Sequence, residues 1–324
     1  MSALQIRELH VTYASQLGPV PAVRGVDLEV TEGEVLGLAG ESGCGKSTIA
    51  HALLRLLPAD ARVEGRVLLD GEDVLGMSFG KLRSVRWGQA AIVFQGAMHA
   101  LNPVRRVGEQ ITEAIRLHDP VDDRKITGRV HDLLERVGLP ARRARDYPHE
   151  LSGGQRQRVM IAMALACSPR LLIADEPTTA LDVMVQAQVL AVLKSLQEEF
   201  GLALLFITHD LSVLAQVCDR IAVMYAGRIV EEGRAEEVFD APAHPYARAL
   251  SGAFPRIGEP EDRRNPTGLG GDPPDPQHLP VGCTFHPRCP ARFEPCDQVD
   301  PTLYPAGEGR RAACLLYDPV RAPA

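Results

Sequence analysis

The sequence predicts an α/β fold with a mostly parallel β-sheet, and two patterns carry this prediction. Short β-like runs, such as 35–39 (VLGLA) and 202–208, alternate with helix-length stretches such as 183–200. That alternation is typical of a parallel sheet flanked by helices. Between about residues 96 and 160 the pattern turns helical, polar and Arg-rich, which predicts a helical subdomain inserted into the α/β core.

Composition and charge narrow the class of protein. An apolar content of 45% in 324 residues is enough for a substantial core. The 35 Lys and Arg residues are outnumbered by 42 Asp and Glu residues, giving a formal net charge of −7, so no nucleic-acid partner is expected. No apolar run approaches the roughly 20 residues that span a bilayer, and the N-terminus lacks a signal-peptide pattern. We therefore expect the chain to stay in the cytoplasm and to reach a membrane only through a partner protein.

The C-terminal quarter differs in composition from residues 1–250. Residues 251–280 form a predicted linker, because the stretch 255–280 is too rich in Pro, Gly and charge to bury apolar surface. Residues 281–324 hold four of the seven cysteines with little regular periodicity. This pattern is typical of a small module held by a metal or a cluster.

A glycine-rich loop predicts a phosphate cradle. Residues 40–48, GESGCGKST, fit the pattern G-x-x-x-x-G-K-[ST] between a strand-like and a helical run. Backbone N–H groups and the helix N-terminus favour phosphate, Lys46 bridges the β- and γ-phosphates, and Ser47 ligates Mg²⁺. A chance Gly-rich turn is the alternative, and the next motifs disfavour it. The predicted nucleotide-binding residues of the loop are Gly40, Glu41, Ser42, Gly43, Cys44, Gly45, Lys46, Ser47 and Thr48.

An acidic pair follows the apolar run 171–174 (LLIA). Asp175 and Glu176 are therefore expected at the carboxyl edge of the sheet, beside the phosphate loop. Asp175 suits Mg²⁺, through water, and Glu176 suits a general base that polarises the attacking water. Alone, such a pair is more often a solvated strand end, so the assignment depends on the surrounding run LLIADEPTTALD.

The segment 151–155 (LSGGQ) predicts a second anion site. Its S-x-x-Q spacing is a capping box at the start of a helix, and a helix N-terminus attracts phosphate. Since the chain already has one cradle, Ser152, Gly153, Gly154 and Gln155 should contact ATP held by another subunit. As an isolated match the segment would be an ordinary helix cap, but it lies about twenty residues before the acidic pair.

With these motifs, residues 1–250 resemble the nucleotide-binding domain of ABC ATPases, in which LSGGQ contacts ATP across a head-to-tail dimer. The resemblance assigns further roles by position. Tyr13 matches the aromatic that stacks on adenine, although an isolated Tyr is more often part of a core. Gln95 matches the glutamine that senses Mg²⁺ and the attacking water, and Asp182 matches the dimer-contacting aspartate. His209 matches the histidine at the γ-phosphate, although a lone His after an apolar strand is usually structural.

The chain is most similar to the ATPases of dipeptide, oligopeptide and nickel importers. The supporting segments are 101–104 (LNPV), 147–150 (YPHE), 244–250 (HPYARAL) and the tail 282–296 (GCTFHPRCPARFEPC). One departure lies at 95–99 (QGAMH), where many relatives carry an acidic residue and a proline after the glutamine. In the family that loop faces the transmembrane partner.

The resemblance implies an ATP-hydrolysing subunit that powers import of di- or oligopeptides. Its expected partners are two transmembrane permease subunits, a second ABC ATPase, either related or identical, and an extracellular solute-binding protein. Its expected place is the cytoplasmic face of the cell membrane. The alternatives are a nickel or metallophore importer of the same family, an exporter, or a non-transport ABC ATPase. Ribosome-acting relatives would carry two nucleotide-binding units, and chromosome-maintenance ATPases a long coiled coil; neither pattern is present.

The four clustered cysteines predict a [4Fe-4S] cluster. Cys283, Cys289, Cys296 and Cys314 are spaced C-x5-C-x6-C-x17-C and can supply four thiolates. Zn²⁺ is the alternative, although the close C-x2-4-C pairs typical of zinc sites are missing. Disulfides are not expected in the cytoplasm. The resemblance points the same way, since the matching tail of peptide-importer ATPases is associated with such a cluster, for which we expect a structural role.

Overall fold

The computed structural model describes residues 2–96, 100–118, 122–179, 181–253 and 269–323. The chain forms two compact units. The first unit contains residues 1–4, 29–34 and 68–207, and the second contains residues 5–28, 35–67 and 208–324. Among the helices of the described ranges, none combines the length and the apolar composition needed to cross a bilayer.

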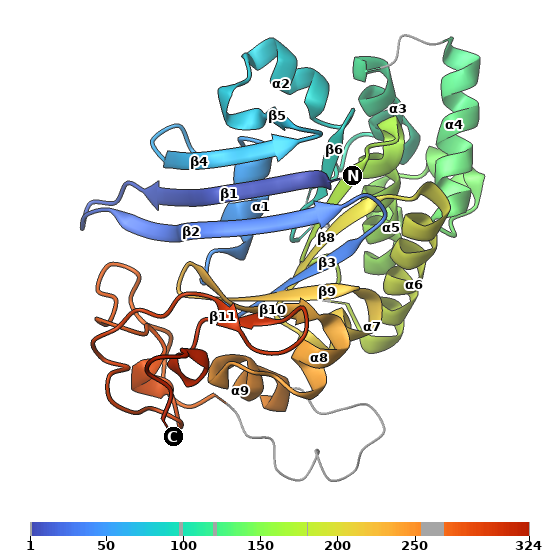
Figure 1. The fold of residues 1–324 in the computed structure, drawn as a ribbon. Coiled ribbons are helices and arrows are strands. Elements are labelled where there is room, and N and C mark those ends of the chain that lie inside the picture. Colours follow the sequence, from blue (N-terminus) through green and yellow to red (C-terminus); the bar gives the residue numbers. More distant parts are fainter. Residues whose placement is uncertain (1, 97–99, 119–121, 180, 254–268, 324) are drawn as a thin grey trace. The chain divides into compact units, whose positions relative to one another are not determined.

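Three long strands of the second unit lie side by side in the order β2-β1-β4 (Figure 1). They are β1 (Ser2–Tyr13), β2 (Val20–Thr31) and β4 (Arg62–Leu69), of which the terminal residues 2–4, 29–31 and 68–69 belong to the first unit. Alternate residues of β2 are buried, as expected for strands that bury one face.

The other strands of the second unit form a mixed sheet in the order β11-β12-β10-β9-β3. Strand β3 (Val35–Ala39) is parallel to β9 (Arg220–Tyr225), which is antiparallel to β10 (Arg228–Arg234). Strand β12 (Arg311–Ala312) pairs antiparallel with β10 and with β11 (Tyr304–Pro305). The expectation of a mostly parallel sheet is therefore confirmed only in part, because β3 and β9 are parallel whereas β10, β11 and β12 extend the sheet with antiparallel pairs.

The tail belongs to the second unit and extends its sheet. Glu231 and Glu232 of β10 are the register partners of Ala312 and Arg311, and the backbone N–H of Ala313 donates to the Val230 carbonyl at 2.7 Å. The structure therefore does not set residues 281–323 apart as a separate module.

Four α-helices lie in the described part of the second unit: α1 (Lys46–Leu53), α7 (Leu211–Val217), α8 (Ala235–Asp240) and α9 (Pro245–Ala253). Helix α7 begins after Asp210, whose carboxylate accepts the backbone N–H groups of Ser212 and Val213. This is the N-cap arrangement that satisfies the first free donors of a helix.

In the first unit, three parallel strands stand in the order β8-β7-β6. They are β6 (Ala90–Val93), β7 (Leu171–Asp175) and β8 (Ala203–Thr208). Every residue of β7 and β8 is buried, which explains their continuous apolar runs. The short strand β5 (Glu72–Asp73) pairs antiparallel with the last residues of β4.

Over its described residues the first unit also carries five α-helices, of which α3 to α6 pack on one another in sequence (Figure 1). They are α2 (Phe79–Val85), α3 (Val107–His118), α4 (Asp123–Arg136), α5 (Gly153–Ala164) and α6 (Val183–Phe200). Helices α3 and α4 and the start of α5 fall where the sequence predicts a helical subdomain. Short 3₁₀ helices are η1 (Val74–Gly76), η3 (Ala141–Arg145), η4 (Pro148–Glu150), η5 (Leu165–Cys167), η6 (His286–Arg288) and η7 (Leu315–Tyr317).

Candidate functional site

The glycine-rich loop connects β3 to α1 in the second unit, and its glycines are required by geometry. Gly40, Gly43 and Gly45 have φ angles of 153°, 80° and 109°, which residues with a Cβ rarely adopt. A Cβ on Gly40 would lie 2.3 Å from the Met224 carbonyl oxygen, and one on Gly45 would lie 2.3 Å from that of Ala22. Tight wrapping of the loop therefore depends on these residues, as the motif predicts.

Lys46 is the first residue of α1 and is buried. Its Nζ donates hydrogen bonds to the carbonyl oxygens of Gly40 at 2.7 Å and Glu41 at 2.9 Å. The ammonium group is thus held inside the loop by the loop's own backbone. This placement suits a cation that contacts phosphates bound in the cradle.

Tyr13, at the end of β1, lies beside the start of α1. Its hydroxyl donates to Thr48 Oγ1 at 3.2 Å, and its side chain is only partly buried. The structure therefore brings Tyr13 to the loop, whereas stacking on adenine stays a prediction.

Cys44 and His209, two further candidate residues of the second unit, differ in solvent exposure. Cys44 is buried and its Sγ is 3.8 Å from Lys46 Nζ, and burial raises the pKa of the thiol. His209 directly follows β8 and is exposed, immediately before Asp210, the N-cap of α7. A histidine at the carboxyl end of a strand can reach a ligand bound at that edge.

In the first unit, Gln95 and the acidic pair come together. Asp175 is the last residue of β7 and is 1% exposed, and Glu176 follows with a φ of 46°. The Glu176 Oε2 atom accepts hydrogen bonds from Gln95 Nε2 at 2.7 Å and from Thr179 Oγ1 at 2.9 Å. A left-handed non-glycine residue is strained and tends to occur at functional sites. Thr179 is not among the site residues predicted from the sequence, although it lies in the run that surrounds the acidic pair.

The segment LSGGQ forms the capping box that the sequence predicts. Ser152 is the N-cap of α5: its Oγ accepts the Gln155 N–H at 3.4 Å, while Gln155 Oε1 accepts the Ser152 N–H at 3.0 Å. Gly153 is the first helical residue. A Cβ on Gly154 would lie 2.2 Å from Val185 Cγ1, so the second glycine is required by packing against α6.

Asp182 has a structural role that the resemblance did not predict. It is the N-cap of α6, and its Oδ1 accepts the Val185 N–H at 2.9 Å. Val185 therefore joins the capped end of α6 to Gly154 of α5. Contact between Asp182 and a second ATPase stays a prediction.

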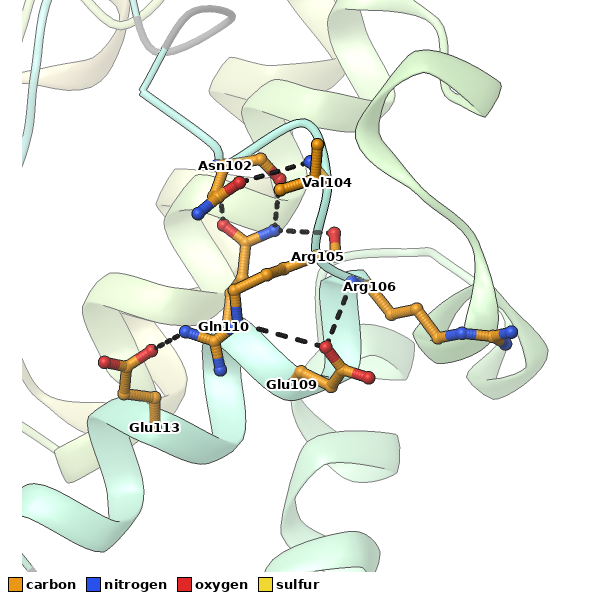
Figure 2. A network of polar contacts seen from close by, with 7 residues as sticks. All are labelled: Asn102, Val104, Arg105, Arg106, Glu109, Gln110 and Glu113. Atoms are coloured by element: carbon orange, nitrogen blue, oxygen red, sulfur yellow. Dashed lines mark hydrogen bonds and ion pairs between the residues drawn. The ribbon is translucent and has the colours of Figure 1, made fainter.

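The side-chain amide of Gln110 holds the backbone of residues 102–105, as Figure 2 shows. The departure at 97–99 lies outside the described residues, but the following LNPV segment is resolved. Gln110 Oε1 accepts the Asn102 N–H at 2.9 Å, and its Nε2 donates to the carbonyl oxygens of Asn102 and Arg105, each at 3.1 Å. Val104 in this segment is 79% exposed.

The four clustered cysteines line one cavity in the second unit, together with Phe285 and Phe293. All four are free thiols. Burial, with neighbouring thiols adding to it, raises the pKa of Cys283 to about 12 and that of Cys314 to about 11. Over the resolved ranges, no group of three or more His, Cys, Asp or Glu side chains is arranged so that it could hold a metal ion. The four thiols therefore line one cavity but are not arranged as metal ligands, so the structure does not support the predicted [4Fe-4S] cluster.

Comparisons with known proteins define the class of protein. Residues 23–179 match the family described as ABC transporter, and residues 230–296 match that described as oligopeptide/dipeptide transporter, C-terminal region. The dimeric structure of a bacterial ABC transporter cassette is 30% identical with a TM-score of 0.64, covering 72% of this chain and 98% of that chain. The structure of cbiO1 from Clostridium perfringens is 30% identical with a TM-score of 0.65, covering 74% and 91%. The fold is that of an ABC ATPase cassette with mixed sheets.

Two curated relatives show which kind of ABC transporter protein the chain resembles. The oligopeptide transport ATP-binding protein OppD of Salmonella typhimurium is 45% identical, covering 96% of this chain and 93% of its own. The dipeptide transport ATP-binding protein DppD of Bacillus subtilis is 42% identical, covering 97% and 95%. The chain therefore belongs to the family of oligopeptide and dipeptide transport ATP-binding proteins of ABC transporters, which confirms the predicted resemblance. Membership implies ATP and Mg²⁺ as ligands.

Proposed function

We propose that this chain is the ATP-binding and ATP-hydrolysing subunit that powers import of di- or oligopeptides through a membrane ABC transporter. The observation that carries the proposal is the near full-length similarity to OppD of Salmonella typhimurium, at 45% identity over 96% of the chain. The similarity extends into the tail, since residues 230–296 match the C-terminal region of oligopeptide/dipeptide transporters. A likeness confined to the cassette would not separate importers from exporters.

Each candidate residue has its own proposed role in hydrolysis. Lys46 would contact the β- and γ-phosphates, and Ser47 and Asp175 would be the ligands of Mg²⁺. Glu176 acts as the general base, and its hydrogen bond from Gln95 (2.7 Å) holds the carboxylate in one orientation. His209 contacts the γ-phosphate from its exposed position after β8.

The LSGGQ segment is proposed to act on a second ATPase subunit, either related or identical. Its capping box leaves the N-terminus of α5 at an exposed or half-buried surface, and helix N-termini favour phosphate. A solved ABC cassette 30% identical to this chain is dimeric in a post-hydrolysis state bound to ADP and phosphate. This likeness supports a dimer with nucleotide at its interface.

The remaining assignments follow from the same proposal. Residues 1–250 form the nucleotide-binding domain, with a helical subdomain at about 96–160, and residues 251–280 connect it to the cysteine-rich segment 281–324. The subunit lies peripherally at the cytoplasmic face of the cell membrane, on two permease subunits that receive cargo from an extracellular solute-binding protein. The [4Fe-4S] cluster, with Zn²⁺ as alternative, is proposed from the four cysteines around one cavity, and no step of hydrolysis is assigned to it.

The proposal is tested in the reconstituted complex. The chain is purified with its two permease subunits and the solute-binding protein, and peptide uptake into vesicles is measured with and without ATP. ATP-dependent uptake that is lost in the Glu176→Gln variant is expected. Mass spectrometry of the ligand carried by the solute-binding protein separates peptides from a nickel chelate. Outward transport, or a complex without a solute-binding protein, would contradict import.

A further inference from the structure

All polar groups of Glu41, the second residue of the glycine-rich loop, are engaged within the second unit. Its backbone N–H donates to the Tyr246 hydroxyl at 2.9 Å, and its carbonyl accepts from Lys46 Nζ at 2.9 Å. Its carboxylate accepts two hydrogen bonds from Arg288, Nη1 to Oε2 at 2.8 Å and Nη2 to Oε1 at 3.0 Å. One residue of the loop therefore links the motif lysine to the cysteine-rich tail.

Arg288 is fixed by contacts on several sides. Its Nε donates to the Gly270 carbonyl at 3.0 Å, and its Nη1 also donates to the Tyr225 hydroxyl at 3.4 Å. The guanidinium carbon lies 5.9 Å from the centroid of the Tyr225 ring. The Arg288 side chain is 7% exposed and that of Glu41 is 22% exposed. The two terminal nitrogens of Arg288 bond the two carboxylate oxygens of Glu41 in parallel, a bidentate geometry that the single ammonium group of a lysine cannot reproduce.

An aromatic cluster supports this position. Tyr225, Tyr246 and Phe285 lie with ring centroids 4.6 to 5.4 Å apart. They come from the end of β9, from α9 and from the tail, and all three are almost completely buried. Because packed interiors tolerate little displacement, Arg288 and the Tyr246 hydroxyl hold Glu41 in a defined place.

The ordinary alternative is an ion pair that only attaches the tail. Exposed pairs contribute little, but this pair is partly buried and bidentate. In addition, the carbonyl of the same Glu41 is a hydrogen-bond acceptor of Lys46. Arg288 and Lys46 are therefore connected through a single residue, because Arg288 bonds the side chain of Glu41 and Lys46 bonds its carbonyl. Attachment alone would alter stability, whereas positioning would alter nucleotide affinity.

We propose that Arg288 is a positioning residue for nucleotide binding, which acts through Glu41 to hold the glycine-rich loop and Lys46 in the phosphate-binding arrangement. The inference rests on the proposed function, in which ATP occupies this loop. A loop that is already ordered loses less freedom when it binds its ligand. Cys289 follows Arg288 directly, so the tail of a transport ATPase takes part in forming its nucleotide site.

The test is the affinity of the purified chain for a fluorescent, non-hydrolysed ATP analogue. Arg288→Gln removes the positive charge and one of the two donors to the carboxylate. Glu41→Gln weakens the same pair by removing the negative charge in the loop, with the sequence of the tail unchanged. Each is expected to raise Kd on the order of tenfold, and the double variant should raise it no further, as partners in one interaction behave. In the assembled transporter, KM for ATP should rise while kcat stays near wild type, because the loop binds ground and transition states alike.

Arg292→Gln is the matched control. Arg292 lies four residues further along the same tail and pairs with Asp297 at 3.1 Å, but both side chains are largely exposed. Its loss should leave Kd unchanged. Thermal unfolding without nucleotide is measured in parallel for all variants.

The outcomes separate the two hypotheses. Failure of the wild-type chain to bind the analogue would refute the proposed function itself. If the wild type binds the analogue and both Arg288→Gln and Glu41→Gln bind it with the wild-type Kd, the inference is wrong. The pair then only attaches the tail, and a lower Tm is the only effect of the variants. If Arg288→Gln does not fold, Glu41→Gln alone decides between these results.

Discussion

The side-chain amide of Gln95 donates a hydrogen bond of 2.7 Å to the Glu176 carboxylate, and Thr179 donates to the same oxygen at 2.9 Å. Two donors on one oxygen select one orientation of the carboxylate. Gln95 follows β6 and Glu176 follows β7, which are neighbouring parallel strands. The two residues therefore lie next to each other at the carboxyl ends of adjacent strands.

Glu176→Gln should retain ATP binding and lose hydrolysis by roughly 10²–10⁴-fold, the usual contribution of a general base. The amide keeps the shape of the side chain but cannot accept the proton of the attacking water. The variant should also accumulate as an ATP-bound dimer, visible by size-exclusion chromatography. Turnover near wild type in the assembled transporter would remove Glu176 from the catalytic role.

Lys46→Ala should instead weaken nucleotide binding itself. The ammonium contacts phosphates in the ground state as well as the transition state, and it also bridges the carbonyls of Gly40 and Glu41. Equilibrium binding of an ATP analogue measures the effect. Lys194→Ala, which removes an exposed lysine of α6, is the control and should bind normally.

The elements predicted best are those whose signal is local. The helix after the glycine-rich loop, the capping box at Ser152 and the strand that ends at Asp175 each depend on fewer than ten neighbouring residues, and such local patterns can be read from the sequence. The helix begins at Lys46, three residues earlier than the apolar run from residue 49 indicates. The hydrogen bond of Gln95 to Glu176 was not predicted as a contact, but both residues were assigned to the same chemistry.

The missed features depend on unusual backbone or on distance along the chain. The β9–β10 hairpin turns at Ala226 and Gly227 with φ angles of 45° and 84°, whereas alanine gives no sign of a left-handed turn. Strand β12 is two residues long, too short for any periodicity. The pair of Arg288 and Glu41 joins residues 247 positions apart, which no local pattern reveals.

Ser152→Arg should impair ATP turnover while leaving this chain's own cradle intact. A long cationic side chain at the start of α5 would block the phosphates of the opposing subunit. Because the change also removes a helix cap worth about 1 kcal/mol, Ser152→Asn serves as a control that keeps a capping side chain without the bulk.

Binding of the ATP analogue to isolated Ser152→Arg chains should match the wild type. If these chains lost affinity as strongly as Lys46→Ala, the assignment of LSGGQ to a second subunit would be wrong.

Gly154→Ala should destabilise the chain by about 1–3 kcal/mol, the usual cost of overpacking. The added methyl would lie 2.2 Å from Val185 Cγ1, so the start of α5 or α6 must shift. Denaturant unfolding measures the loss, and Val185→Ala in the same chain should recover much of it by removing the clashing atom. Gly128→Ala in α4, where a Cβ meets nothing within 4 Å, should be neutral or stabilising. Equal stabilisation by alanine at both glycines would show that helix propensity, and not a clash with Val185, decides the stability change at Gly154.

Replacing any one of Cys283, Cys289, Cys296 or Cys314 by Ser should bleach anaerobically purified protein and lower its iron and acid-labile sulfide content. Four thiolates are the usual ligand set of a [4Fe-4S] cluster, and all four thiols line one cavity. A cluster would also stabilise the tail, so each variant should show a lower Tm. Cys167→Ser, at a half-buried cysteine outside the cavity, is the control and should keep the colour. Stoichiometric zinc without iron in protein prepared under those conditions would show a Zn²⁺ site in place of the cluster. Protein that contains neither metal would show that the four thiols only line an apolar cavity.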